Sequence, residues 1–156
     1  MKAKILLICI IILAFSCKNE KSSEEIVSPV ETKTEPLKIE GAWELVSFYN
    51  YTDNKVVDSY KTQEGYRQVK IYTPSKVMWS KNVPTDSTEW FGYGSYKIEN
   101  GQLMETLDYG SKMMKMRIQE NKEFVFELNL SKDAFSQIEL DEDGNRIFSE
   151  NYKRIE

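Results

Sequence analysis

Glu105 is the residue whose position points most clearly to chemistry, because the spacing around it turns its carboxylate toward the protein interior. It lies two residues before Leu107 and four before Tyr109, so all three share one face of a predicted strand. An inward carboxylate costs several kcal/mol unless it is paired or hydrogen-bonded. Its expected partners are Arg154, tyrosine hydroxyls, or Lys70 if that strand has the register opposite to the one we predict. A structural ion pair and a ligand-recognising group both remain open.

The sequence limits catalysis, because it contains no histidine. Ser–His–Asp and Cys–His mechanisms are therefore excluded, as is a histidine-ligated haem, and a catalytic zinc ion would lack its commonest ligand. An enzyme would need Glu105 as a general base beside a tyrosine. Asp141-Glu142-Asp143 lacks the spaced ligands of a calcium loop. We therefore predict no catalytic residue, no metal site and no cofactor.

Aromatic side chains suggest a ligand pocket around Glu105. Trp79, Tyr96 and Tyr109 fall on predicted inward faces together with Glu105. Aromatic walls with one or two polar groups are typical of a small-ligand site. The alternative is that these rings simply fill the interior, since an eight-stranded barrel holds either its own side chains or one small ligand.

The elements that must position these residues are strands. Alternation of apolar and polar residues indicates a buried and an exposed face in each; over 66–73 we expect Val69 and Ile71 to be buried and Lys70 to face outward. Residues 51–64 are predicted to form a long loop or an extra hairpin around Val56-Val57. Strands are expected over 42–48, 66–73, 76–81, 92–99, 103–109, 114–118, 124–130, 137–141 and 147–155.

Short turns such as Glu99-Asn100-Gly101 and Asp143-Gly144-Asn145 separate these segments. Regular short strands without a useful helical pattern predict an all-β fold, an antiparallel up-and-down β-barrel of about eight to ten strands. Four neighbouring methionines are then more easily explained as core and rim positions than as an adaptable ligand surface: Met104, Met113, Met114 and Met116.

The two ends of the domain carry a more specific pattern. The first strand opens with Gly41-Ala42-Trp43, and the last closes with Tyr152-Lys153-Arg154. With Val77-Met78-Trp79 and Gly92-Tyr93-Gly94 between them, this order resembles the lipocalin-like domain of bacterial, Bacteroidetes-type lipoproteins. The resemblance covers nearly all of 41–156. It implies a barrel closed by pairing of the first and last strands, with Arg154 over the ring of Trp43 in a cation–π contact.

The beginning of the chain predicts its location. Lys2 and Lys4 precede an apolar run over 5–15, and Ser16-Cys17 follows. This pattern is typical of a secretory signal peptide, and the run is too short to span a bilayer. A cysteine after a small residue resembles a lipobox, which implies a signal peptide over 1–16 and acyl chains such as palmitate on Cys17. The alternative is ordinary secretion, with Cys17 as a free thiol.

Residues 17–39 are polar and carry two prolines, which predicts a disordered tether in front of a domain over 40–156. Its charges resemble a surface-export signal, and a merely solvated tether is the alternative. The full chain has a net charge of −4, and loss of Lys2 and Lys4 with the signal peptide makes this −6. No basic patch suggests nucleic acid.

Together these features predict a lipoprotein anchored to the outer membrane, on its periplasmic face or at the cell surface. Its barrel is expected to bind a small hydrophobic or amphipathic ligand. The alternative is a non-catalytic interaction module of a cell-envelope assembly, with a filled barrel. A cavity of about 300 Å³ or more would favour binding, and a packed interior would favour the module.

Overall fold

The computed structural model describes residues 36–156, so the predicted signal peptide, Cys17 and most of the predicted tether lie outside the described residues. Strands make up most of the described part. In chain order the elements are β1 (Gly41–Thr52), β2 (Lys55–Lys61), β3 (Arg67–Tyr72), β4 (Lys76–Asn82), β5 (Trp90–Glu99), β6 (Gln102–Gly110), α1 (Lys112–Glu120), β7 (Glu123–Leu130), β8 (Ala134–Leu140) and β9 (Arg146–Arg154).

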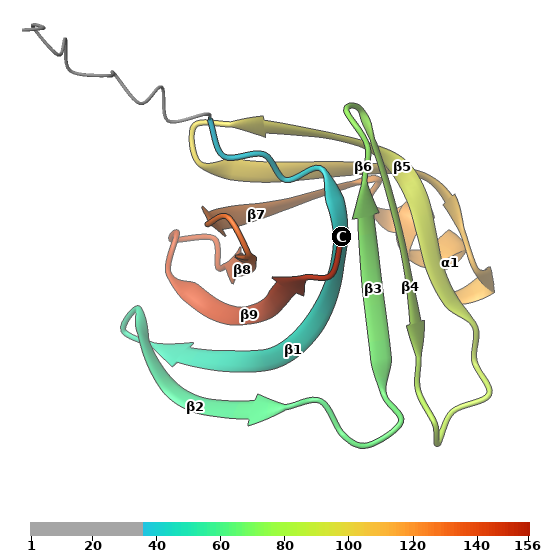
Figure 1. The fold of residues 1–156 in the computed structure, drawn as a ribbon, viewed down its shortest axis with the longest axis horizontal. Coiled ribbons are helices and arrows are strands. Elements are labelled where there is room, and N and C mark those ends of the chain that lie inside the picture. Colours follow the sequence, from blue (N-terminus) through green and yellow to red (C-terminus); the bar gives the residue numbers. More distant parts are fainter. Residues whose placement is uncertain (1–35) are drawn as a thin grey trace, which may run out of the picture. The chain divides into compact units, whose positions relative to one another are not determined.

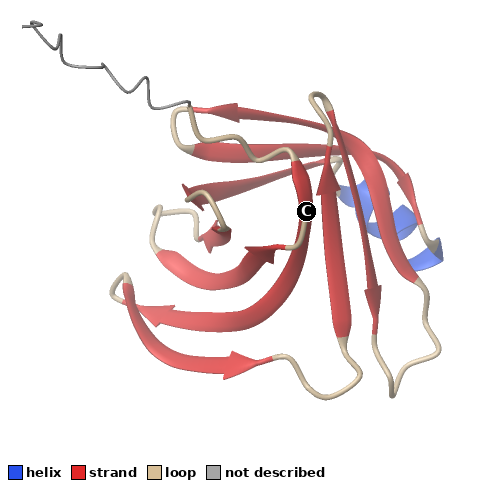
Figure 2. Cartoon of the chain, in the orientation of Figure 1, coloured by secondary structure: helices blue, strands red, loops and turns tan. Residues whose placement is uncertain are grey.

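The strands form one antiparallel sheet that closes into a ring (Figures 1 and 2). From β3 to β9 each strand pairs with the next along the chain, and β9 returns to pair with β1. This confirms the predicted all-β, up-and-down antiparallel architecture. Closure leaves the strands of the ring without free edges, which would otherwise invite aggregation.

The insertion after β1 is a hairpin rather than a loop. β1 is long enough to pair twice along one edge: Gly41–Glu44 pairs with β3, and the later part from Ser47 pairs with β2. Asp53 and Asn54 both have positive φ, 49° and 60°, as a two-residue hairpin turn requires. Of the two alternatives expected for residues 51–64, a long loop or an extra hairpin around Val56-Val57, the structure has the hairpin. Strand β2 is exposed along its whole length.

One end of the ring, here called the closed end, is filled by Trp43. Its side chain is completely buried, and the Arg154 guanidinium lies 3.9 Å from the ring centroid. The predicted cation–π contact and the β1–β9 pairing are thus confirmed. Trp43 also donates a hydrogen bond to the Ile39 carbonyl (2.7 Å), and Arg154 donates one to the Lys38 carbonyl (2.8 Å). The last residues assigned to the tether therefore pack on the domain.

The predicted strand over 114–118 is wrong, because this segment lies in helix α1. Ser111 caps the helix by accepting a hydrogen bond from the Met114 backbone N–H. Lys, Met, Arg, Gln and Glu are good helix formers, and the segment has one β-branched residue, Ile118. Met114 and Ile118 are four residues apart, so they face the core together, while Met116 is exposed. Helix α1 packs on β5 and β6 (Figure 2).

The predicted faces of β3 are also reversed. Lys70 is buried and Ile71 is 44% exposed, although the alternation of apolar residues predicted the opposite. Lys70 pairs with Trp43 on β1 and with Trp79 on β4, and residues paired across strands share a face. The buried ammonium is tolerated because it pairs with the buried carboxylate of Glu105.

Candidate functional site

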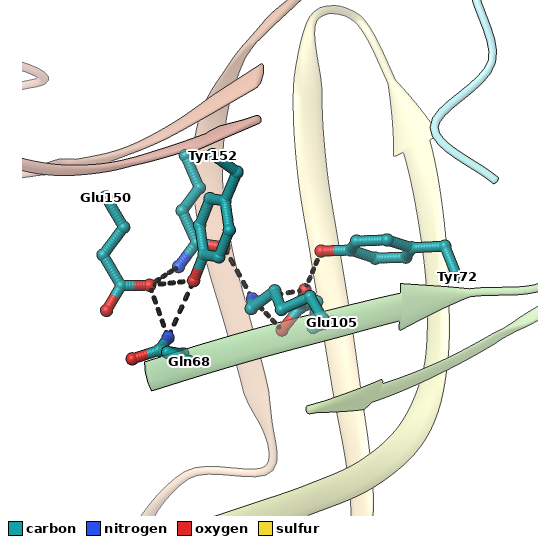
Figure 3. A network of polar contacts seen from close by, with 7 residues as sticks. Gln68, Tyr72, Glu105, Glu150 and Tyr152 are labelled. Carbon is teal, nitrogen blue, oxygen red and sulfur yellow. Dashed lines mark hydrogen bonds and ion pairs between the residues drawn. The ribbon is translucent and has the colours of Figure 1, made fainter. Parts of the chain in front are cut away.

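The interior of the ring holds a buried ion pair between Lys70 and Glu105. The ammonium donates to both carboxylate oxygens, at 2.8 and 3.1 Å, and to the side-chain oxygen of Gln137 at 2.6 Å. Tyr72 donates its hydroxyl to Glu105 at 2.5 Å (Figure 3). Both charged side chains are only 3% exposed. From sequence, the role of Glu105 was undecided between a structural ion pair and a ligand-recognising group. In the structure its carboxylate is paired with the Lys70 ammonium and accepts a hydrogen bond from the Tyr72 hydroxyl.

Glu150 is the second carboxylate of this network, and its two oxygens differ. Oε2 accepts three hydrogen bonds from neutral groups: from Tyr152 at 2.5 Å, from Gln137 at 2.9 Å and from Gln68 at 3.2 Å. Figure 3 shows Tyr152 and Gln68 on one side of the Glu150 carboxylate and the other oxygen turned away from them. Within residues 36–156 no hydrogen bond reaches Oε1 and no cation pairs with Glu150. Its charge is therefore solvated by hydrogen bonds and not neutralised.

A cavity of about 150 Å³, here called the inner cavity, opens beside this network. Its polar wall includes Glu105, Lys70 and Glu150, and Lys81 lines it as well. The apolar wall consists of five side chains from four elements: Trp79, Leu107, Met114, Phe124 and Phe126. An apolar wall facing a few convergent polar groups is the usual construction of a small-ligand site.

Trp79 is placed against this cavity by Gly92, its partner on β5. A Cβ atom at Gly92 would lie 2.8 Å from the indole Nε1 of Trp79. The absence of a side chain at Gly92 thus makes the room that the indole occupies. The prediction that Trp79 faces the interior and lines a cavity agrees with this geometry.

Of the four predicted ligand residues, Trp79 and Glu105 line the inner cavity, and Tyr96 and Tyr109 do not. Tyr96 is half-buried but packs on Tyr72, 5.0 Å between ring centroids, and donates to the Thr73 carbonyl near the closed end. Tyr109 is 53% exposed, so its predicted inward position is wrong. The cause is a bulge at Asp108: Tyr93 pairs with Tyr109, whereas the next residue on β5 pairs with Leu107. One extra residue reverses the alternation beyond it.

A second hollow of about 200 Å³, here called the acidic pocket, adjoins the inner cavity. Its lining residues are Phe126, Gln137, Glu139, Phe148 and Glu150, three of which also line the inner cavity. Sequence reasoning missed these residues. The sole signal was that 137–141 and 147–155 were expected to be neighbouring strands. A larger hollow of about 420 Å³ is bordered by the loop between β4 and β5 and shares only Lys81 with the lining of the inner cavity.

The buried tyrosines of the network hold their protons strongly. Burial, reinforced by the Glu105 carboxylate, raises the pKa of Tyr72 well above its usual value. Burial and the Glu150 carboxylate do the same to the pKa of Tyr152 and raise the pKa of Tyr66 to about 12. At neutral pH each hydroxyl is therefore a hydrogen-bond donor: Tyr72 donates to Glu105, Tyr152 donates to Glu150, and Tyr66 donates to the side-chain oxygen of Gln68.

These shifts predict a loss of stability in alkaline solution. The native chain retains tyrosine protons that the unfolded chain loses above about pH 10. The free energy of unfolding should thus be unaffected below pH 10 and fall above it, by up to about 1.4 kcal/mol per pH unit for each tyrosine. For Tyr66 the decline continues to its native pKa of about 12. Urea unfolding from neutral pH to about pH 11 measures this slope.

Tyr66→Phe should reduce the alkaline slope, whereas the exposed Tyr109→Phe should leave it unchanged. Absorbance of tyrosinate in the folded protein provides an independent check. Simultaneous ionisation of all nine tyrosines near pH 10 in the native state would contradict the assignment.

No family model matches the chain, and no curated protein matches it. A crystal structure of an uncharacterized protein from Bacteroides eggerthii is similar to it, with a TM-score of 0.48 and 15% sequence identity. The match covers 75% of this chain and 99% of that one. This likeness carries no conclusion about function, and the resemblance to lipocalin-like lipoproteins stays a prediction. No helix within residues 36–156 has the length and apolarity needed to cross a membrane.

Proposed function

We propose that this protein is a non-catalytic, lipid-anchored binding protein of the cell envelope that takes up a small amphipathic molecule in its inner cavity. The observation that carries the proposal is the composition of that cavity, in which apolar walls from Trp79, Met114 and Phe126 face the charged groups of the buried network. Such a site suits a molecule with an apolar body and one polar end.

The volume limits the size of this molecule. The inner cavity measures about 150 Å³, about half of the smallest pockets that hold drug-sized ligands. A cavity of about that size in another protein admits benzene. We therefore expect an apolar group comparable to one benzene ring and not a long acyl chain.

The alternative, a filled barrel that acts as an interaction module, is favoured by one observation. Within residues 36–156 every fully buried side-chain nitrogen or oxygen atom has a hydrogen-bond partner. The fully buried atoms of the network are thus satisfied without a ligand. The two functions differ in whether a small molecule enters beside it.

Benzyl alcohol is a suitable probe for this cavity. The NMR signals of the tryptophan indole N–H groups report where it binds. The probe is titrated into the chain carrying Cys17→Ser, to avoid detergent. We expect the Trp79 signal to shift, because its ring lines the cavity, and the Trp43 signal at the closed end to remain in place.

Two matched variants on helix α1 test the location. Met114→Phe places a larger side chain in the cavity and should abolish the shift of Trp79. Met113→Phe makes the same change on the exposed side of the helix and should preserve the shift. An unchanged Trp79 signal in the parent chain, or an equal shift with Met114→Phe, would support the filled-barrel module instead.

A further inference from the structure

The acidic pocket has a composition that the proposed function does not yet use. Its five lining residues comprise two carboxylates (Glu139 and Glu150), two aromatic rings (Phe126 and Phe148) and one amide (Gln137). None of them is basic, so the formal charge of the lining is −2. Cations are attracted both to carboxylates and to the faces of aromatic rings.

In the part of the chain that the structure describes, no basic side chain neutralises either carboxylate of this pocket. Within residues 36–156 no ion pair includes Glu139 or Glu150. The ammonium group of Lys70 already donates hydrogen bonds to both oxygens of Glu105 and to the side-chain oxygen of Gln137. Lys81 lines the inner cavity but not the acidic pocket.

The free oxygen of Glu150 is the specific acceptor. Three neutral donors hold its Oε2, which fixes the orientation of the carboxylate, while Oε1 accepts no hydrogen bond from residues 36–156. A fixed, partly buried carboxylate oxygen favours an N–H donor that is itself charged, because the Coulombic attraction between opposite charges adds to the hydrogen bond. Phe126 already has the Lys70 ammonium 5.8 Å from its ring centroid, so its ring can accept a cation.

We propose that the acidic pocket recognises an organic ammonium group, and that the ligand of this protein is a small amine whose apolar part lies in the inner cavity. This inference rests on the proposed function, because Phe126, Gln137 and Glu150 border both hollows. One molecule can therefore place its ring beside Trp79 and its ammonium beside Glu150. A metal ion is a poorer occupant, since residues 36–156 contain no group of three carboxylate, cysteine or histidine ligands.

Benzylamine and benzyl alcohol test the proposal, because they share a ring and differ in charge at neutral pH. Affinities are measured by titration calorimetry on the chain carrying Cys17→Ser, with the Trp79 indole signal as the reporter of location. We expect benzylamine to bind at least about tenfold more tightly than benzyl alcohol. The preference should shrink as salt is added, because the pocket is open to solvent.

Three glutamate variants locate the charge that matters. Glu150→Gln should bring the ratio of the two affinities close to one. Glu139→Gln should reduce the ratio partly. The Glu139 side chain is exposed and makes no hydrogen bond within the described residues, so this variant should fold and test the proposal even if Glu150→Gln does not fold. Glu142→Gln, in the turn after β8, changes the net charge equally and should leave the ratio unchanged.

The outcomes separate the two proposals. Equal affinities of the parent chain for both probes, or a preference that survives both Glu150→Gln and Glu139→Gln, would overturn the ammonium site and leave the binding function standing. Absence of binding by either probe would overturn both. Displacement of benzylamine by an equal concentration of calcium chloride would show that the acidic pocket binds a metal ion and not an organic cation.

Discussion

Glu105→Gln should lower the free energy of unfolding by about 3–5 kcal/mol, because it leaves the buried Lys70 ammonium without its counter-charge. Glu105 is 2% exposed and accepts from both Lys70 and Tyr72. Water cannot replace the lost charge at such a position. Lys70→Met should cost a comparable amount, since the carboxylate would then stay buried with the tyrosine hydroxyl as its remaining donor in the network. Urea unfolding monitored by tryptophan fluorescence measures both changes.

The double variant distinguishes a mutual interaction from two separate defects. Lys70→Met combined with Glu105→Gln should be more stable than the sum of the single losses predicts, by about 1–3 kcal/mol, because neither variant side chain leaves a buried charge. The exposed pair Lys76–Asp108, at 3.8 Å, is the control, and its removal should cost less than about 1 kcal/mol. A loss below that level for Glu105→Gln would show that the carboxylate faces solvent.

Cys17→Ser should move the protein from the membrane to the soluble fraction almost completely. This prediction depends on the proposed acylation of Cys17, which lies outside the described residues. Each methylene group of an acyl chain contributes about 0.8 kcal/mol to membrane binding, so two or more chains make attachment effectively permanent. Fractionation of cell envelopes, with salt and carbonate washes, measures the partition.

Cys9→Ser provides the matched control, because this cysteine lies in the apolar run of the predicted signal peptide and its loss should not affect anchoring. If the Cys17→Ser protein still sediments with washed membranes, the anchor is not an acyl chain on Cys17. If the parent protein is itself soluble, ordinary secretion with a free thiol is the correct alternative.

The prediction from sequence succeeded where local pattern and tertiary structure agree. Period-two alternation gave the strands, and short turns gave their antiparallel order. The Gly41-Ala42-Trp43 opening and the late Arg154 predicted the closure of the ring through the resemblance to lipocalin-like domains, and the β1–β9 pairing confirms this closure. These features depend on interactions between near neighbours or on one distinctive pair.

The candidate site was less predictable, because single residues that break the local rule decide it. One extra residue at Asp108 turns Tyr109 outward. The apolar residues of 114–118 are compatible with a strand or with a helix. In the structure the segment is a helix that packs on β5 and β6. No local pattern records the bulge, whereas the helix-forming residues and the Ser111 cap were a local signal for the helix that the apolar alternation outweighed.

The sequence by itself determined an all-β ring, its closure by Trp43 and Arg154, and an inward Glu105. Only the tertiary structure decided that Lys70 also points inward and that Glu150 keeps one oxygen free. Alternation assigns polar residues to the solvent side because burying an unpaired charge is costly. That cost disappears only when a partner from a strand distant in sequence occupies the same space, and such a meeting is a property of the fold.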